Sequence, residues 1–104
     1  MESFNIVLSP CAVASIEEIY DYICNVLKEP EFAFNTIQKI YNVILSLKVL
    51  PNRIKIASAK DLKEREIRII YANNNAILFC IKGPDIVIID VVYSKSNIEA
   101  KFEK

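Results

Sequence analysis

Apolar residues recur with two different periods along the chain, and the change of period predicts which segments are helices and which are strands. Alternation over Phe4–Leu8 predicts a short strand. Ser9 and Pro10 follow, a pair typical of a helix start, because serine caps the free amides of the first turn and proline fits the first helical position. Apolar residues then recur at helical spacing, which predicts an amphipathic helix with one apolar stripe formed by Ile16, Ile19, Tyr20, Ile23 and Leu27.

A second segment with helical spacing follows the break at Pro30. It runs over residues 31–48, and Pro51 forbids its continuation. Two helices joined by so short a connection predict an αα-hairpin. The apolar stripe of this second helix consists of Phe34, Ile37, Ile40, Tyr41, Ile44 and Leu47.

The C-terminal half changes to strand-like patterns. Residues 53–64 show no sustained period and are expected to form a loop. Three β-rich runs follow, separated by turn compositions at Asn73–Asn75 and Lys82–Asp85, and such short connections predict an antiparallel meander. The last run is apolar on nearly both faces, which favours the sheet interior. The three runs are Ile67–Tyr71, Ala76–Ile81 and Asp85–Val92.

The order of elements predicts an α+β fold with an N-terminal strand, an αα-hairpin and a three-strand antiparallel meander, the helices packing on one face of the sheet. The 104 residues, 53% of them hydrophobic, fit a single domain over 1–104. The longest apolar run, Ala76–Ile81, is far shorter than the roughly 20 residues of a membrane span. An acid at position 2 does not suit a signal peptide, so we expect a cytoplasmic protein with no membrane partner.

Cysteine and histidine content argues against metal and cofactor chemistry. The three cysteines have no CxxC spacing, and the chain has no histidine to complete a zinc site or to serve as base for a nucleophilic thiol. We therefore expect no metal and no cofactor, with the cysteines as small apolar residues.

The net charge of zero hides an uneven distribution. Residues 1–37 carry six acidic side chains and one basic one, whereas residues 38–68 carry eight basic and three acidic side chains. A polyanion or an acidic partner is therefore expected at the middle segment, unless its bases only solvate loops and helix faces. The candidate nucleic-acid contacts are Lys55, Lys60, Lys63 and Arg65.

Several segments, taken in order, resemble the RelE/ParE superfamily of toxins from bacterial type II toxin–antitoxin pairs. They are Phe4–Pro10, Ile16–Ile23, Ile44–Lys48 followed by Pro51, and Ile67-Arg68 leading a strand pair that closes on Val91-Val92-Tyr93. The resemblance implies one of two activities: ribosome-dependent cleavage of mRNA by a metal-free endoribonuclease, as in RelE-like toxins, or poisoning of DNA gyrase, as in ParE-like toxins. It also implies a cognate antitoxin as partner, in a toxin–antitoxin hetero-oligomer, and a homodimer remains open.

For the nuclease branch the resemblance implies three catalytic candidates. Arg68 matches the arginine that opens the second strand in these toxins and would bind phosphate. Tyr93, directly after the last strand, matches a position where many members have histidine and would take part in proton transfer, and Lys95 would supply a second cation.

The chain departs from the nuclease pattern at several positions. Cys80 and Ser96 stand where relatives often carry basic residues, Asp90 is acidic, and the sequence pI is near 6.3. We predict a toxin that inhibits growth by ribosome-dependent mRNA cleavage. Because of these departures, a gyrase-directed toxin and a diverged non-catalytic interaction module of the same fold stay open as alternatives.

Overall fold

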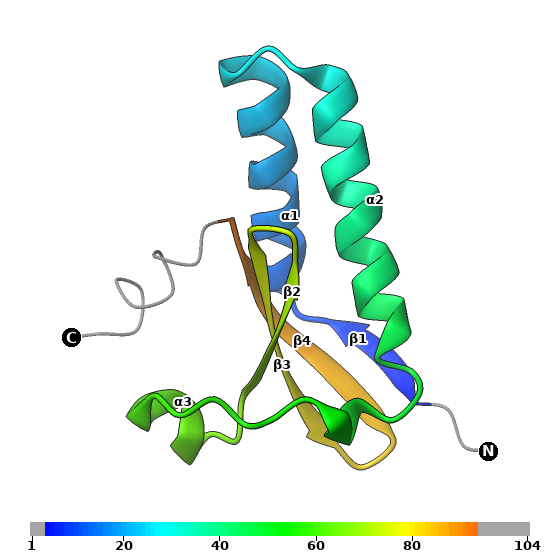
Figure 1. Cartoon of the computed structure of the whole chain (residues 1–104), viewed down its shortest axis with the longest axis vertical. Helices are drawn as coiled ribbons and strands as arrows, with labels where there is room; N and C mark the ends of the chain where they lie inside the picture. Colours follow the sequence, from blue (N-terminus) through cyan, green and yellow to red (C-terminus); the bar gives the residue numbers. More distant parts are fainter. Residues whose placement is uncertain (1–3, 94–104) are drawn as a thin grey trace.

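A four-stranded mixed sheet carries a helical hairpin in the computed structural model, which describes residues 4–93 (Figure 1). The predicted α+β fold class is confirmed, including the N-terminal strand, the αα-hairpin and the three-strand meander. The strands are β1 (Asn5–Leu8), β2 (Arg68–Ala72), β3 (Asn75–Lys82) and β4 (Asp85–Val92). The helices are α1 (Pro10–Asp21), the π-helical turn η1 (Tyr22–Val26), α2 (Pro30–Ser46), the 3-10 turn η2 (Pro51–Arg53) and α3 (Lys60–Glu64).

The sheet has the strand order β1-β4-β3-β2. β4 lies in its interior, as its two apolar faces predict, parallel to β1 and antiparallel to β3. β2 is antiparallel to β3 and forms the other edge. The two hairpin turns lie where the sequence predicts them. Each contains a residue type that tolerates a positive φ: Asn73, with φ 58°, and Gly83, with φ 60°.

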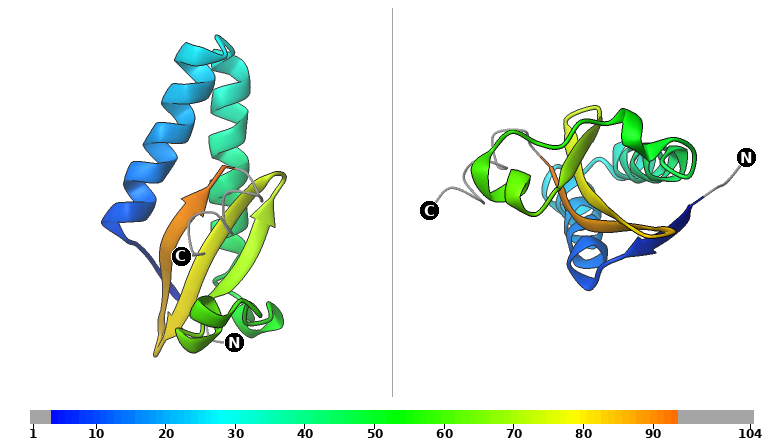
Figure 2. Two further views of the ribbon diagram at one scale, coloured as in Figure 1. Left: turned by 90° about the vertical axis from the view of Figure 1, so that its left-hand side faces the viewer. Right: turned by 90° about the horizontal axis from the view of Figure 1, so that it is seen from below.

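The main core lies between the sheet and the hairpin (Figure 2). Isoleucines from both helices pack there against Phe79, Ile86 and Ile88, all three of which are fully buried. A smaller cluster covers the opposite face of the sheet, where Leu62 of α3 packs on Leu78. Within residues 4–93, no helix is long and apolar enough to cross a lipid bilayer.

The segment expected as a loop, residues 53–64, contains a short helix. α3 occupies its last five residues, so the prediction of an irregular loop is wrong there. A five-residue helix presents only one buried side chain, Leu62 at 1% exposure, and a single apolar residue gives no period to detect. Burial of Leu62 against the second face of the sheet holds this helix in place.

Ser9 caps α1 as the sequence predicts. Its Oγ accepts the backbone N–H of Ala12 at 3.0 Å and donates to the carbonyl oxygen of Ile89 at 2.7 Å. One hydroxyl therefore fixes the start of α1 and ties it to β4.

We expect Ser9→Ala to lower the free energy of unfolding by about 1–2 kcal/mol, because it removes the cap and leaves the Ile89 carbonyl without this donor. Urea denaturation at unchanged m-value measures the loss. Ser46→Ala is the matched control, since the Ser46 hydroxyl is exposed, donates to Val43 within its own helix and accepts only a long hydrogen bond, 3.4 Å, from Arg53. Equal losses in the two variants would contradict the capping role.

Candidate functional site

Arg68 stands at the start of β2 and is half-buried. Its Nη1 donates a hydrogen bond to the carbonyl oxygen of Ile54 at 2.6 Å, and Ile56 forms an isolated antiparallel bridge with residue 68. The guanidinium therefore holds the segment before α3 against the edge strand. Its remaining N–H groups are the ones left for an anion.

Tyr93 follows β4 and packs, half-buried, against the main core. Its ring meets the ring of Tyr22 edge to face, with centroids 6.0 Å apart and planes inclined by 60°. Tyr22 belongs to η1 and is 45% exposed. The aromatic pair thus joins the end of the sheet to the helical hairpin.

The strand register separates Arg68 from Tyr93. Arg68 pairs with Phe79 on β3, whereas Val92, the residue before Tyr93, pairs with Ala76. The two candidates are four residue positions apart along the strands, or about 13 Å at roughly 3.3 Å per residue, and lie two strands apart in the sheet. These backbone positions are widely spaced for two groups that would act on one phosphate. Lys95 lies outside the described residues, so the three-residue site stays a prediction.

Cys80 and Asp90, two of the residues that depart from the nuclease pattern, are both buried in the sheet. Cys80 is 7% exposed in the middle of β3 and pairs with Val87. Asp90 is 3% exposed and accepts hydrogen bonds from the Ser15 hydroxyl at 2.5 Å and the Val91 N–H at 2.8 Å. Ser96 lies outside the described residues. Asp90 therefore connects β4 to α1 and is not presented to solvent.

The four candidate nucleic-acid contacts all lie at one end of the molecule. The side chains are exposed and belong to the segment around α3, at the end of the molecule opposite the tip of the helical hairpin (Figure 1). Three acidic residues are interspersed with them, so the segment 55–66 has only one more basic than acidic side chain. Their use as nucleic-acid contacts stays a prediction. The four residues are Lys55, Lys60, Lys63 and Arg65.

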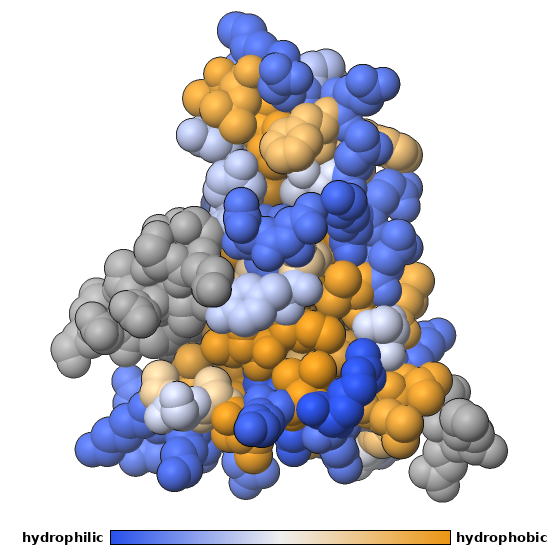
Figure 3. Space-filling view, viewed as in Figure 1, coloured by the Kyte–Doolittle hydropathy of each residue, from blue (hydrophilic) through white to orange (hydrophobic). Residues whose placement is uncertain are grey.

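Apolar side chains also reach the surface near this basic end. The space-filling view shows a hydrophobic band between the hydrophilic residues of the hairpin and those of the α3 end (Figure 3). Next to η2, Val49 is 42% exposed, Leu50 70% and Ile56 37%. The basic end therefore offers apolar anchors together with cations, as an interface with an acidic protein segment requires.

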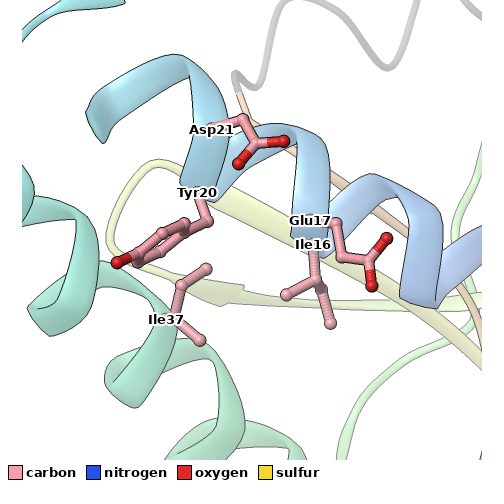
Figure 4. A pocket seen from close by; sticks show the side chains of 5 residues that line it. All are labelled: Ile16, Glu17, Tyr20, Asp21 and Ile37. Atoms are coloured by element: carbon pink, nitrogen blue, oxygen red, sulfur yellow. The ribbon is translucent and has the colours of Figure 1, made fainter. Parts of the chain in front are cut away.

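The opposite half of the molecule contains a groove that the sequence analysis missed. It lies between α1 and α2, has a volume of about 410 Å³, and is lined by Ile16, Glu17, Tyr20, Asp21 and Ile37 (Figure 4). The sequence assigned Tyr20, Phe34 and Tyr41 to the core stripes, yet they are 38%, 56% and 37% exposed. Phe34 and Tyr41 each follow a buried residue directly, and the turn of about 100° between neighbours carries them to the edge of the helix's buried face.

Acidic and thiol side chains do not gather into a metal site in the part of the chain that the structure describes, residues 4–93. No three of them come together there. The cysteines lie apart: Cys11 is exposed, Cys24 is half-buried and Cys80 is buried.

Comparison with solved structures finds several similar chains. A chain from the chromosomal ParDE toxin–antitoxin system of P. aeruginosa superposes with a TM-score of 0.74 at 21% sequence identity, covering 89% of this chain and 98% of that chain. No family model and no curated protein matches the sequence. The similarity therefore shows a shared fold over nearly the whole of both chains.

Proposed function

We propose that this chain is the toxin component of a type II toxin–antitoxin pair. The observation that carries the proposal is the fold match with a chain of a ParDE system, which covers 89% of this chain and 98% of that chain. The segments that resemble the RelE/ParE superfamily form the same elements that make up this fold: β1, the hairpin and the meander.

The mode of action that the geometry supports best is binding to DNA gyrase, as in ParE-like toxins. Cleavage of RNA by attack of the ribose 2′-OH needs a proton acceptor, a proton donor and a cation around one phosphate. Arg68 and Tyr93 are about 13 Å apart along the strands, and the Arg68 guanidinium is bound to Ile54. An inhibitor that acts by binding needs no such convergence. Ribosome-dependent mRNA cleavage is the second candidate.

The expected partner is a cognate antitoxin that neutralises the toxin in a hetero-oligomer. The basic end offers exposed cations next to exposed Leu50 and Ile56. An extended or helical antitoxin segment with acidic residues and apolar anchors fits this chemistry.

The test is inducible expression in a bacterium, with DNA and protein synthesis followed in parallel by pulse labelling. We expect an early block of DNA synthesis while translation continues, and the same block, within about twofold, in the double variant Arg68→Ala with Tyr93→Phe. The reason is that neither side chain takes part in a chemical step in this mode of action.

Arg53→Ala is the matched control for the loss of an arginine, because the Arg53 guanidinium also donates to main-chain carbonyls, those of Val49 and Leu50. Immunoblots confirm equal amounts of each variant. An early block of translation that the double variant relieves, and Arg53→Ala does not, would instead establish the ribonuclease. No growth effect at equal expression would overturn the toxin assignment and favour a non-catalytic interaction module.

A further inference from the structure

The groove between α1 and α2 combines an apolar floor with an acidic rim. Ile16 and Tyr20 from α1 and Ile37 from α2 point toward one another between the helices, and Glu17 and Asp21 stand beside them on α1 (Figure 4). Tyr20 is 38% exposed, so its ring is accessible from the groove. The volume of about 410 Å³ lies within the usual range of binding cavities, roughly 300–1,000 Å³.

The negative charge of the rim has no compensation within the helix. α1 contains three acidic residues and no basic one. Glu17 and Asp21 are one helical turn apart, a spacing at which like charges repel and weaken a helix. Neither carboxylate forms an ion pair within residues 4–93. A cation bound here would relieve this repulsion.

We propose that this groove binds a cationic amphipathic helix of a partner protein. The helix places one large apolar side chain between Tyr20 and Ile37, and lysine or arginine side chains one turn apart reach Glu17 and Asp21. Burial of the apolar anchor supplies affinity, and the paired charges fix the register of the helix in the groove.

The same charges argue against the other occupants. A second copy related by a twofold axis would bring the same acidic face of α1 against itself, which like charges disfavour. A nucleic acid would carry its phosphates to two carboxylates. The groove also lies at the hairpin, away from the basic end around α3 (Figure 1), so partners of opposite charge can bind to the two surfaces at the same time.

The test uses the purified full-length protein and a fluorescein-labelled synthetic helix of leucine and lysine, with fluorescence anisotropy as the readout. The comparison peptides carry glutamate in place of lysine, or the same residues in a scrambled, non-amphipathic order. We expect the lysine helix to bind most tightly and its affinity to fall as salt is added. Binding is measured without any growth assay, so the result does not depend on the toxin assignment.

The double variant Glu17→Gln with Asp21→Asn is expected to weaken binding of the lysine helix about 3- to 10-fold, and Tyr20→Ala to weaken it by a similar factor. Glu18→Gln is the control for loss of one acidic charge from the same helix outside the groove, because Glu18 does not line it, and the affinity of this variant should change less than about twofold. Circular dichroism verifies the fold of each variant.

Two results would overturn the proposal. One is equal affinity for the lysine and glutamate helices, or equal effects of Glu18→Gln and of the double variant. The other is self-association of the unlabelled protein in sedimentation analysis that Tyr20→Ala abolishes, which would make a second copy the occupant of the groove.

Discussion

Phe79→Ala is expected to lower the free energy of unfolding by about 3–5 kcal/mol. Phe79 is fully buried on β3, among the largest of the fully buried side chains, and belongs to the main core between the sheet and the hairpin. Backbone pairing holds its strand neighbours Arg68 and Ile88 in place, so the sheet cannot move to fill the cavity that loss of the ring leaves. Because small domains are stable by only about 5–15 kcal/mol, urea denaturation should show a midpoint far below that of the parent chain.

Phe34→Ala is the control for the same change of side chain, since Phe34 is 56% exposed on α2 and should cost less than about 1 kcal/mol. Should Phe79→Ala fail to fold, Phe79→Leu keeps the comparison measurable with an expected loss of about 1–2 kcal/mol. Similar losses at positions 34 and 79 would mean that the sheet and the hairpin do not share the core described above.

Local signals in the sequence were sufficient for most element boundaries. Ser9 and Pro10 predicted the start of α1, and the hydroxyl of Ser9 does accept the Ala12 N–H. The turn compositions placed both β-hairpins, and the apolar last strand lies in the sheet interior. Each of these features depends on residues adjacent in the chain, which is why pattern alone could predict them.

Long-range pairing was not accessible in the same way. β1 pairs in parallel with β4, from which it is separated by about three quarters of the chain, and no local pattern encodes that partner. The exposure of Tyr20 and Phe34 also depends on how α1 and α2 pack. The spacing of apolar residues predicts which face of a helix is buried, but not how much of that face the neighbouring element covers.

The candidate site shows the same limit. The resemblance to a known family suggested Arg68 and Tyr93, but the distance between them follows from the register of three strands. The groove between the helices combines Tyr20 with Ile37, 17 positions later, and becomes visible only when the hairpin is assembled. Candidate site residues can thus be named from the sequence, whereas only the folded structure shows which of them lie close together.

Asp90→Ala is expected to lower the free energy of unfolding by about 2–4 kcal/mol. Phe79 pairs with Ile88 and Leu78 with Asp90, so Ile89 is an extra residue and β4 bulges there. The Asp90 carboxyl accepts the Val91 N–H beyond the bulge and the Ser15 hydroxyl of α1. Its removal leaves buried donors without this acceptor and loosens the contact of α1 with β4.

Asp85→Ala is the matched control on the same strand, because Asp85 is only half-buried and its exposed hydrogen bond from Asn5 is long, at 3.3 Å; we expect a loss below about 1 kcal/mol. A double-mutant cycle with Ser15→Ala should give a coupling energy near 1 kcal/mol between Ser15 and Asp90. Equal losses of unfolding free energy at positions 85 and 90, with no coupling between Ser15 and Asp90, would contradict this structural role of Asp90. With the role upheld, an acid close to Tyr93 reflects the geometry of a strand bulge, and its presence does not count against phosphate binding by this chain.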